Sequence, residues 1–292
     1  MSPSDLRRSI LETAKKDPVF LKIADEITAP SDKHINITGM TDSQKAYVAA
    51  ALAANAGTKP VVLVPDELRA RTVQQDLSAF LDGEVLILRP RELNLADVDA
   101  SSREAELSRI GVLMRLLSGD FGGAVITAGA LTNRLMPDAA FRSSVVYLKL
   151  GMRVSPEDLA MRLINIGYER TRNVGGEGEF ARRGDIFDVY PIGEDEPVRI
   201  SFFDEDIDQI KKFDLETQRS TDPLKRIGIA PARELLVPED KRGEIARAIL
   251  HEGEEARRTA AENGASRDVC ENFTRLAAQD AGRISEGLLF GG

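Results

Sequence analysis

Short apolar segments alternate with helical segments in the first half of the chain, and this alternation limits the possible folds more than any other feature. The apolar segments have the length of strands and lie at 61–64, 85–88 and 124–127. Unbroken apolar runs are typical of parallel strands, because helices bury such strands on both faces. Segments with helical spacing lie between them, at about 43–56, 68–80 and 101–117. The sequence therefore predicts an α/β domain built on a parallel sheet.

The N-terminal residues lead into this pattern. Apolar residues at near-helical spacing predict helix over 3–28, with a break at Pro18. The segment His34–Ile37 has the length of a strand and is followed by a turn and the Ala-rich helix at 43–56. We therefore expect a strand at 34–37.

The pattern changes near residue 139, where segments typical of hairpins replace the alternation. Ser155 and Pro156 suit the start of a helix, which we expect to run to about Ile166. Strand-like segments lie at 145–150, 168–174, 178–182, 186–190, 198–203 and 208–214. Residues 241–292 are charged and Ala-rich and predict two or three helices. This change predicts a domain boundary near 138–142.

Composition excludes several classes of protein. The chain has 48 acidic and 39 basic residues, and a net charge of −9 argues against nucleic acid as the main partner. A single cysteine, Cys270, fits a reducing cytoplasm, and with two histidines in the chain it argues against a Cys/His metal site. No apolar run approaches the roughly 18 residues of a membrane span. We expect a cytoplasmic protein without membrane contact.

A turn between a predicted strand and helix has the position of a phosphate-binding P-loop. The pattern G-x-x-x-x-G-K-[ST] is met by Gly39 and Lys45. Gln44 stands where glycine would let the backbone wrap phosphates, and Ala46 replaces the hydroxyl that would bind Mg²⁺. Asp42 adds a negative charge beside this position. We interpret the turn as having lost nucleotide binding, with weak nucleotide binding as the alternative.

Acidic residues elsewhere resemble cation ligands. Asp66 and Glu67 follow the strand at 61–64, as in a Walker B strand, but they also suit the cap of the next helix, which we favour. Acidic runs at 194–196 and 204–208 have no histidine nearby, and we interpret them as solvated turns. The sequence therefore predicts no metal site.

A basic set with interleaved aromatic residues lies in the second half. It comprises Arg170, Arg172, Arg182 and Arg183, with Tyr168, Phe180, Phe187 and Tyr190. Arginine and aromatic residues are enriched at the energetic centres of protein interfaces. The alternative is an ordinary exposed sheet face whose arginines pair with Glu169, Glu177 and Glu179. The residue types alone leave both interpretations open.

Four segments of this half resemble the UvrB-homology module of the bacterial transcription-repair coupling factors, the Mfd family. They are Gly167–Arg170, Gly178–Pro191, Pro197–Phe203 and Phe213–Ser220. The P-loop-like turn and the predicted strands and helices occur in the family's order, so the resemblance covers about residues 25–240. The repair helicase UvrB shares this module but resembles a working ATPase with an intact P-loop and a long aromatic hairpin. The interval Arg89–Ser102 contains no Tyr or Phe where that hairpin would be, which favours the coupling factors.

The resemblance implies a particular architecture. A parallel-sheet domain similar to RecA and other P-loop NTPases, without nucleotide chemistry, would comprise residues 1–138 and 203–240. A small α+β domain would be inserted at 139–202, and 241–292 would begin a variable third domain. The translocase motor and the polymerase-binding domain of the family are missing, so we expect an N-terminal fragment or, as the alternative, a stand-alone paralogue.

The resemblance also implies binding rather than catalysis, with no cofactor. The inserted domain resembles the UvrB surface that binds UvrA, and the matching positions are Arg170, Glu179, Phe180, Arg182, Arg183 and Phe187. Arginine can hold a carboxylate through two hydrogen bonds, and an aromatic neighbour would supply a desolvated anchor. The expected function is recruitment of UvrA to a stalled transcription complex, with RNA polymerase and DNA contacted only through the missing domains. The alternatives are a UvrB-like ATPase and a DNA-binding module that uses the Arg170–Arg183 patch.

Overall fold

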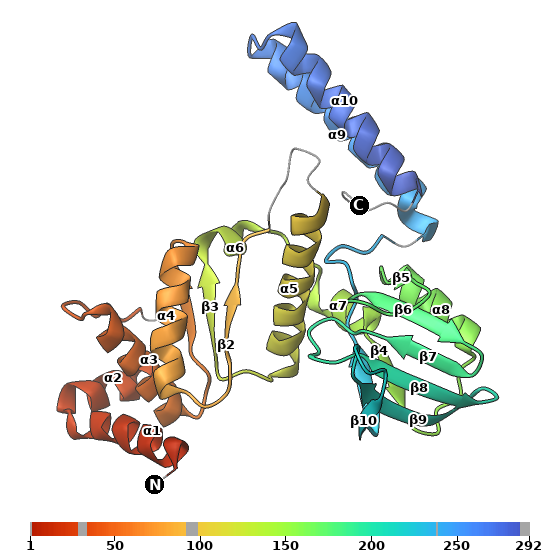
Figure 1. Ribbon diagram of the computed structural model, residues 1–292. Coiled ribbons are helices and arrows are strands. Elements are labelled where there is room, and N and C mark those ends of the chain that lie inside the picture. Colours follow the sequence, from red (N-terminus) through yellow and green to blue (C-terminus); the bar gives the residue numbers. More distant parts are fainter. Residues whose placement is uncertain (1, 29–33, 92–98, 238, 287–292) are drawn as a thin grey trace. The chain divides into compact units, whose positions relative to one another are not determined.

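The computed structural model describes residues 2–28, 34–91, 99–237 and 239–286 (Figure 1). The chain is a mixed α/β protein with both parallel and antiparallel sheets. It divides into two compact units, which we describe one at a time. The first unit comprises Met1–Glu92 and Gly111–Arg134, and the second comprises Leu93–Ile110 and Leu135–Gly292.

A parallel sheet forms the centre of the first unit. Among the described residues its strands lie in the order β1 (Val61–Val64), β3 (Gly123–Thr127) and β2 (Val85–Leu88). The helices that alternate with them are α3 (Asp42–Ala56), α4 (Glu67–Phe80), the short α6 (Ala128–Thr132) and α5 (Asp99–Ser118). The division between the units falls within α5, whose residues up to Ile110 belong to the second unit. The structure therefore confirms the predicted alternation of apolar strands and helices.

The alanines of α3 form part of the core of the first unit. They share a buried cluster with residues of α4 and of all three strands, namely Ala46, Ala50, Val64, Ala70, Leu77, Val85 and Val125. The helix begins after the N-cap Thr41 and ends at Gly57, whose φ of 65° is a left-handed conformation that glycine adopts without steric cost.

The N-terminal prediction is confirmed for its helices and wrong for its strand. The helices are α1 (Pro3–Glu12), a 3₁₀ turn (Thr13–Lys16) and α2 (Pro18–Thr28), with the predicted break at Pro18. Residues 34–37 belong to no strand of the described chain. A strand needs hydrogen-bonding neighbours as well as a suitable local pattern, and the pattern does not supply those neighbours.

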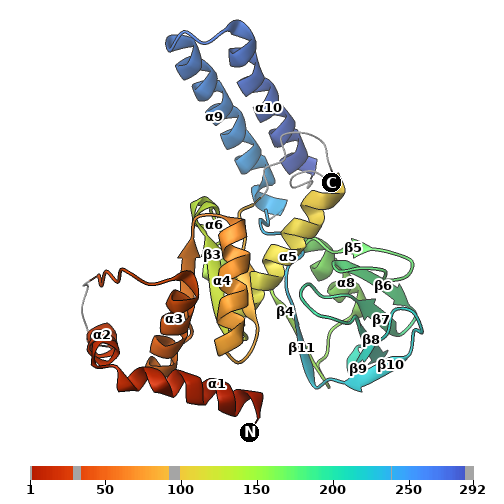
Figure 2. The same cartoon turned by 60° about the vertical axis from the view of Figure 1, so that its left-hand side comes forward.

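A mixed sheet forms the centre of the second unit. Within the described residues it has the order β10-β9-β8-β7-β6-β5, and its pairs are antiparallel except that β5 and β6 are parallel. The strands are β5 (Glu169–Arg170), β6 (Glu179–Arg183), β7 (Ile186–Val189), β8 (Val198–Phe203), β9 (Asp206–Phe213) and β10 (Ser220–Pro223). Helix α8 (Pro156–Asn165) lies along this sheet (Figures 1 and 2), and its Leu159 and Leu163 are fully buried.

A second, two-stranded ladder also belongs to this unit. The strand β4 (Val146–Lys149), which follows α7 (Asp138–Ser144), pairs antiparallel with β11 (Arg226–Ile229). A buried ion pair at 2.5 Å between Arg109 of α5 and Glu234 holds the segment after β11.

This pairing contradicts the predicted boundary at residue 202. That residue lies inside β8, which pairs with β9, and β10 extends the same sheet. The strand β11 then returns to β4 rather than to the parallel sheet of the first unit. The hydrogen-bonded ladders are continuous across 202, so the segment predicted to rejoin the first domain belongs to the second unit. The earlier boundary, predicted at 138, differs little from the division after Arg134.

Two long helices form an antiparallel hairpin near the end of the described chain. They are α9 (Arg242–Glu262) and α10 (Arg267–Glu286), and they lie side by side in Figures 1 and 2. Their contact contains alanines and isoleucines, and at one point a glycine: a Cβ added at Gly253 would lie 2.3 Å from the Cβ of Ala277. The two helices can pack this closely at Gly253 because glycine has no side chain.

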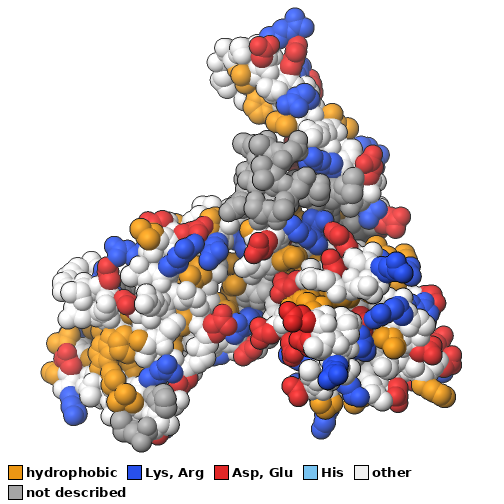
Figure 3. Space-filling model, in the orientation of Figure 1, with side chains coloured by type: hydrophobic (Ala, Val, Ile, Leu, Met, Phe, Trp, Pro, Cys, Tyr) orange, Lys and Arg blue, Asp and Glu red, His pale blue; other side chains and the backbone are white. Residues whose placement is uncertain are grey.

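The surface carries charges of both signs. Acidic and basic side chains are interspersed on the face shown in Figure 3. Among the described residues, no helix combines the length and the apolar character that crossing a membrane requires.

Replacement of Gly253 by alanine tests the packing of the helix hairpin. We expect Gly253→Ala to lower the free energy of unfolding by about 1–3 kcal/mol, since the two Cβ atoms cannot both fit. Gly282→Ala is the matched control, because a Cβ there meets nothing within 4 Å and the change removes a helical glycine, a gain of up to about 1 kcal/mol. Urea denaturation followed by circular dichroism measures both. Equal stability of the two variants would contradict the close contact.

Candidate functional site

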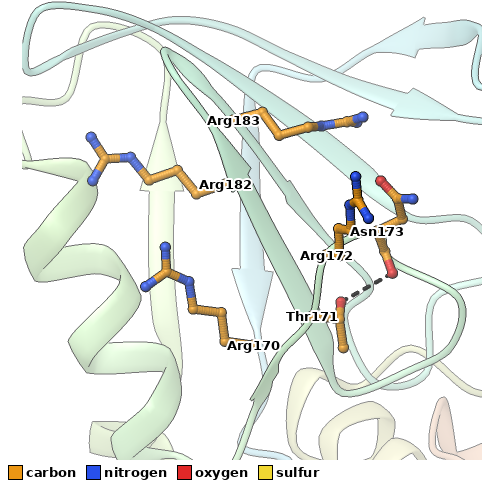
Figure 4. Close-up of a pocket in the computed structure, with 6 residues that line it drawn as sticks. All are labelled: Arg170, Thr171, Arg172, Asn173, Arg182 and Arg183. Carbon is orange, nitrogen blue, oxygen red and sulfur yellow. Dashed lines mark hydrogen bonds between the residues drawn. The ribbon is translucent and has the colours of Figure 1, made fainter.

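A pocket lined by arginines lies at the β5 edge of the six-stranded sheet (Figure 4). Its lining residues are Arg170, Thr171, Arg172, Asn173, Arg182 and Arg183. The structure therefore brings together three of the predicted partner-binding residues, Arg170, Arg182 and Arg183. The pocket is also lined by Thr171, Arg172 and Asn173, of which the sequence analysis had singled out only Arg172.

Strand register divides these arginines between two faces. Arg170 of β5 pairs with Phe180 of β6, so its side chain shares a face with Phe180 and Arg182. Arg183 points to the opposite face. Figure 4 shows this division, with Arg170 and Arg182 on one side of the strands and Arg172 and Arg183 on the other. The pocket therefore wraps around the sheet edge rather than lying on one face.

Arg182 is bound to helix α8. Its guanidinium donates to the carboxylate of Glu157, in the first turn of that helix. This hydrogen bond holds the pKa of Glu157 below its usual value. Arg182 therefore enters the pocket with its charge already compensated.

Arg183 is bound to a buried carboxylate. Its Nη2 donates to Oδ2 of Asp188 at 2.9 Å, and the Asp188 side chain is only 3% exposed whereas that of Arg183 is 52% exposed. Arg199 binds the same carboxylate through Nε at 2.7 Å and Nη2 at 2.9 Å. The bond to Asp188 raises the pKa of Arg199. Two guanidiniums share one carboxylate here, so a positive charge remains.

The other two arginines of the pocket have no charged partner. Within the described chain, neither Arg170 nor Arg172 forms an ion pair, and both are exposed. The four arginines are thus opposed by the carboxylates of Glu157 and Asp188, and the second is shared with Arg199. The pocket is therefore strongly positive on a chain that is negative as a whole, which suits a ligand with several carboxylates or phosphates.

The two predicted aromatic contacts lie in the core. Phe180 and Phe187 are both 0% exposed, and their rings stack with centroids 5.3 Å apart and an interplanar angle of 1°. The expectation that Phe187 is an exposed anchor beside the arginines is therefore corrected. An aromatic residue in a strand can belong to an interface or to the core of a sheet, and the sequence does not distinguish the two. Only the strand register shows which face of the sheet carries the ring.

Glu179 shapes the loop beside the pocket. Its Oε2 accepts a hydrogen bond from the backbone N–H of Gly175 at 2.7 Å. Gly178 has a φ of 82°, which a residue with a side chain rarely adopts. These two features fix the conformation of the Gly-rich segment between β5 and β6, and the relative placement of the arginines depends on that segment. Glu179 is partly buried, and its carboxylate binds the protein's own backbone.

The P-loop-like turn of the first unit is capped by its own side chains. The Thr41 hydroxyl accepts from the backbone N–H of Gln44 at 3.4 Å, and Oε1 of Gln44 accepts from the N–H of Thr41 at 2.9 Å. The Lys45 ammonium donates to Asp42 at 3.1 Å, and Arg69 binds the same carboxylate. The Lys45 ammonium and the backbone N–H of Gln44, which would contact a phosphate in a P-loop, therefore have partners within the protein. Gly39 has a φ of 81°, a left-handed conformation that glycine adopts without steric cost.

The acidic candidates have structural roles. Asp66 is the N-cap of α4 and accepts from the N–H of Arg69 at 2.8 Å, which confirms the capping interpretation. Asp204 and Glu205 form the turn between β8 and β9. In the part of the chain that the structure describes, no group of three or more acidic, His or Cys side chains could hold a metal ion.

The chain is similar to known proteins over its second half and over most of its length. A family model described as the UvrB interaction domain matches residues 146–235. The chain is 36% identical over 208 residues to the transcription-repair-coupling factor of Bacillus subtilis (strain 168), covering 70% of this chain and 18% of that protein. It is 32% identical over 231 residues to that of Myxococcus xanthus, covering 76% and 19%, and 30% identical over 206 residues to that of Staphylococcus aureus (strain Mu50), covering 70% and 18%.

These matches confirm the resemblance to the transcription-repair coupling factors. The chain spans about a fifth of the length of the curated relatives it matches. The matched domain, residues 146–235, includes both strand ladders of the second unit and every residue that lines the arginine pocket.

Truncation of Phe187 tests its corrected role. We expect Phe187→Ala to lower the free energy of unfolding by about 3–5 kcal/mol, because it empties a fully buried position and leaves the ring of Phe180 unstacked. Phe203→Ala, at a side chain that is 77% exposed on β8, is the control and should change stability by less than about 0.5 kcal/mol. Thermal unfolding followed by circular dichroism gives the comparison. A Phe187→Ala protein as stable as the control would show that the ring is not part of the core.

Proposed function

We propose that the second unit is a docking module for UvrA and that the chain recruits nucleotide excision repair to stalled RNA polymerase. The observation that carries the proposal is the arginine pocket, which lies within the residues matched by the UvrB interaction domain. UvrB and this chain would then present the same kind of surface to one partner. A strongly positive pocket on an acidic chain is a local feature, as expected of a specific contact site rather than of a general nucleic-acid surface.

The chemistry of the pocket suits a protein partner with acidic side chains. Arginine offers planar, paired donors to a carboxylate, and Arg170 and Arg172 have these donors available. The buried rings of Phe180 and Phe187 would support the strands that carry the arginines instead of contacting the partner. Glu179 would act in the same indirect way, by holding the loop through Gly175.

For the first unit we propose a RecA-like fold that has lost nucleotide binding, next to a UvrB-like second domain. The order of strands and helices and the position of the turn at Gly39 support this. The capping box at Thr41 and Gln44, and the ion pair of Lys45 with Asp42, support a role without ATP. The chain would therefore act by binding and not by catalysis. Contacts with RNA polymerase and DNA would belong to the rest of a longer protein.

Titration of UvrA is the decisive test of the docking module. We expect Arg183→Ala and Arg170→Ala each to cost about 1–3 kcal/mol of binding free energy, measured by isothermal calorimetry with the purified chain. Arg226→Ala is the control, because Arg226 is exposed on β11 of the same unit and does not line the pocket. Affinity that survives both pocket substitutions would exclude the pocket as the docking site. Binding of duplex DNA at physiological salt without UvrA, weakening steeply as salt rises, would favour the DNA-binding alternative instead.

A nucleotide titration tests the first unit. We expect no saturable binding of a non-hydrolysable ATP analogue with Mg²⁺, because the phosphate-facing donors at Gln44 and Lys45 already have partners. Binding is monitored by calorimetry, with an intact P-loop ATPase as the positive control. Saturation at micromolar analogue would favour the UvrB-like ATPase.

A further inference from the structure

We infer that Asp188 is a positioning residue for partner binding: it holds the guanidinium of Arg183 in the orientation in which the partner meets it. This inference rests on the proposed docking function. Asp188 itself cannot touch a partner, since its side chain is 3% exposed. It would act only through Arg183, whose side chain is half exposed.

The strand register brings the three charged groups together. Asp188 of β7 pairs with Ala181 of β6, and Arg183 lies two residues further along β6 on the same face. On the other side, Asp188 pairs directly with Arg199 of β8. The small side chain of Ala181 leaves the carboxylate accessible to the diagonal neighbour, so Arg183 can reach it.

The carboxylate is itself held firmly. Arg199 binds both of its oxygens, through Nε to Oδ1 at 2.7 Å and through Nη2 to Oδ2 at 2.9 Å. The Arg199 guanidinium is in turn fixed from two directions. Its carbon lies 4.5 Å from the centre of the Phe213 ring, and its Nη1 donates to the Gln218 carbonyl at 3.1 Å. Asp188 is thus a rigid acceptor rather than a mobile surface carboxylate.

Arg183 meets this acceptor with a single nitrogen. Its Nη2 bonds to Oδ2, and within the described chain its side chain makes no other hydrogen bond. The remaining N–H donors are left for a ligand. The two guanidiniums outweigh the one carboxylate, so the positive charge that would attract a partner carboxylate is retained.

Holding Arg183 in place matters because arginine is costly to order. A free arginine side chain loses considerable rotamer freedom when a partner immobilises it. A side chain that is already oriented in the unbound protein avoids most of that loss, and affinity rises accordingly. The geometry of Asp188 therefore points to preorganisation of one arginine in the pocket.

A double-mutant cycle separates this role from a purely structural one. The four proteins are the wild type, Asp188→Asn, Arg183→Ala and the double variant, each titrated with UvrA and each checked by thermal unfolding. We expect Asp188→Asn to weaken binding about tenfold, the size of one charge-assisted hydrogen bond. The double variant should bind like Arg183→Ala alone, because Asp188 has nothing left to position. Glu194→Gln, which removes the ion pair with Lys212 in the same unit, is the matched control and should bind like the wild type.

A measurement on the unbound wild type keeps the inference testable if Asp188→Asn does not fold. Nitrogen-15 relaxation of the Arg183 Nε group should show a restricted guanidinium before any partner is added. Free rotation of that group would overturn the inference. So would wild-type affinity in a folded Asp188→Asn protein, or losses from the two single variants that simply add.

Failure of the proposed function gives a different pattern. If wild-type protein does not bind UvrA, the docking assignment falls and takes with it the role of Asp188 in partner binding. A restricted Arg183 in that same protein would show that the orientation is correct and that the partner was misidentified.

Discussion

The antiparallel register of β6 against β7 decides what the second unit can present to a partner. It sets Phe180 opposite Val189 and Arg182 opposite Phe187, so that the stacked rings face the core, and it puts Asp188 and Arg183 together on the other face. A shift of one residue would turn the rings of Phe180 and Phe187 away from the core face and put Arg183 on it, which the hydrophobic core forbids. Burial of the two rings and exposure of Arg183 are therefore one constraint.

The two units differ in how far their polar and charged side chains are paired. In the first unit, polar groups at the turn before α3 satisfy one another, through the capping box of Thr41 and Gln44 and the pairing of Lys45 with Asp42. In the second unit, guanidiniums outnumber their carboxylate partners, so charge is left for a ligand. A protein can be acidic overall and still offer such a pocket, since only the local balance of charge acts across a contact.

Much of the fold could be predicted from local pattern, because apolar runs of this length favour strands even where, as at Val61 and Leu63 of β1, the side chains are exposed. The apolar runs at 61–64, 85–88 and 124–127 became the three parallel strands, and Ser155 with Pro156 opened α8 as expected. Predictions failed where partners distant in sequence decide the outcome. The segment 34–37 has the pattern of a strand and no partner strand in the described chain, and the boundary at 202 cut a ladder that only pairing reveals.

The sequence by itself determined the chemistry of the candidate site: which residues are arginines, that aromatic residues accompany them, and that the P-loop pattern is broken at Gln44 and Ala46. Only the tertiary structure decided their roles. In the folded protein Phe187 is buried and Arg182 binds Glu157. Arg183 and Arg199 both bind Asp188. The physical reason is that side-chain type is a local property, whereas exposure and ion pairing depend on which strands become neighbours.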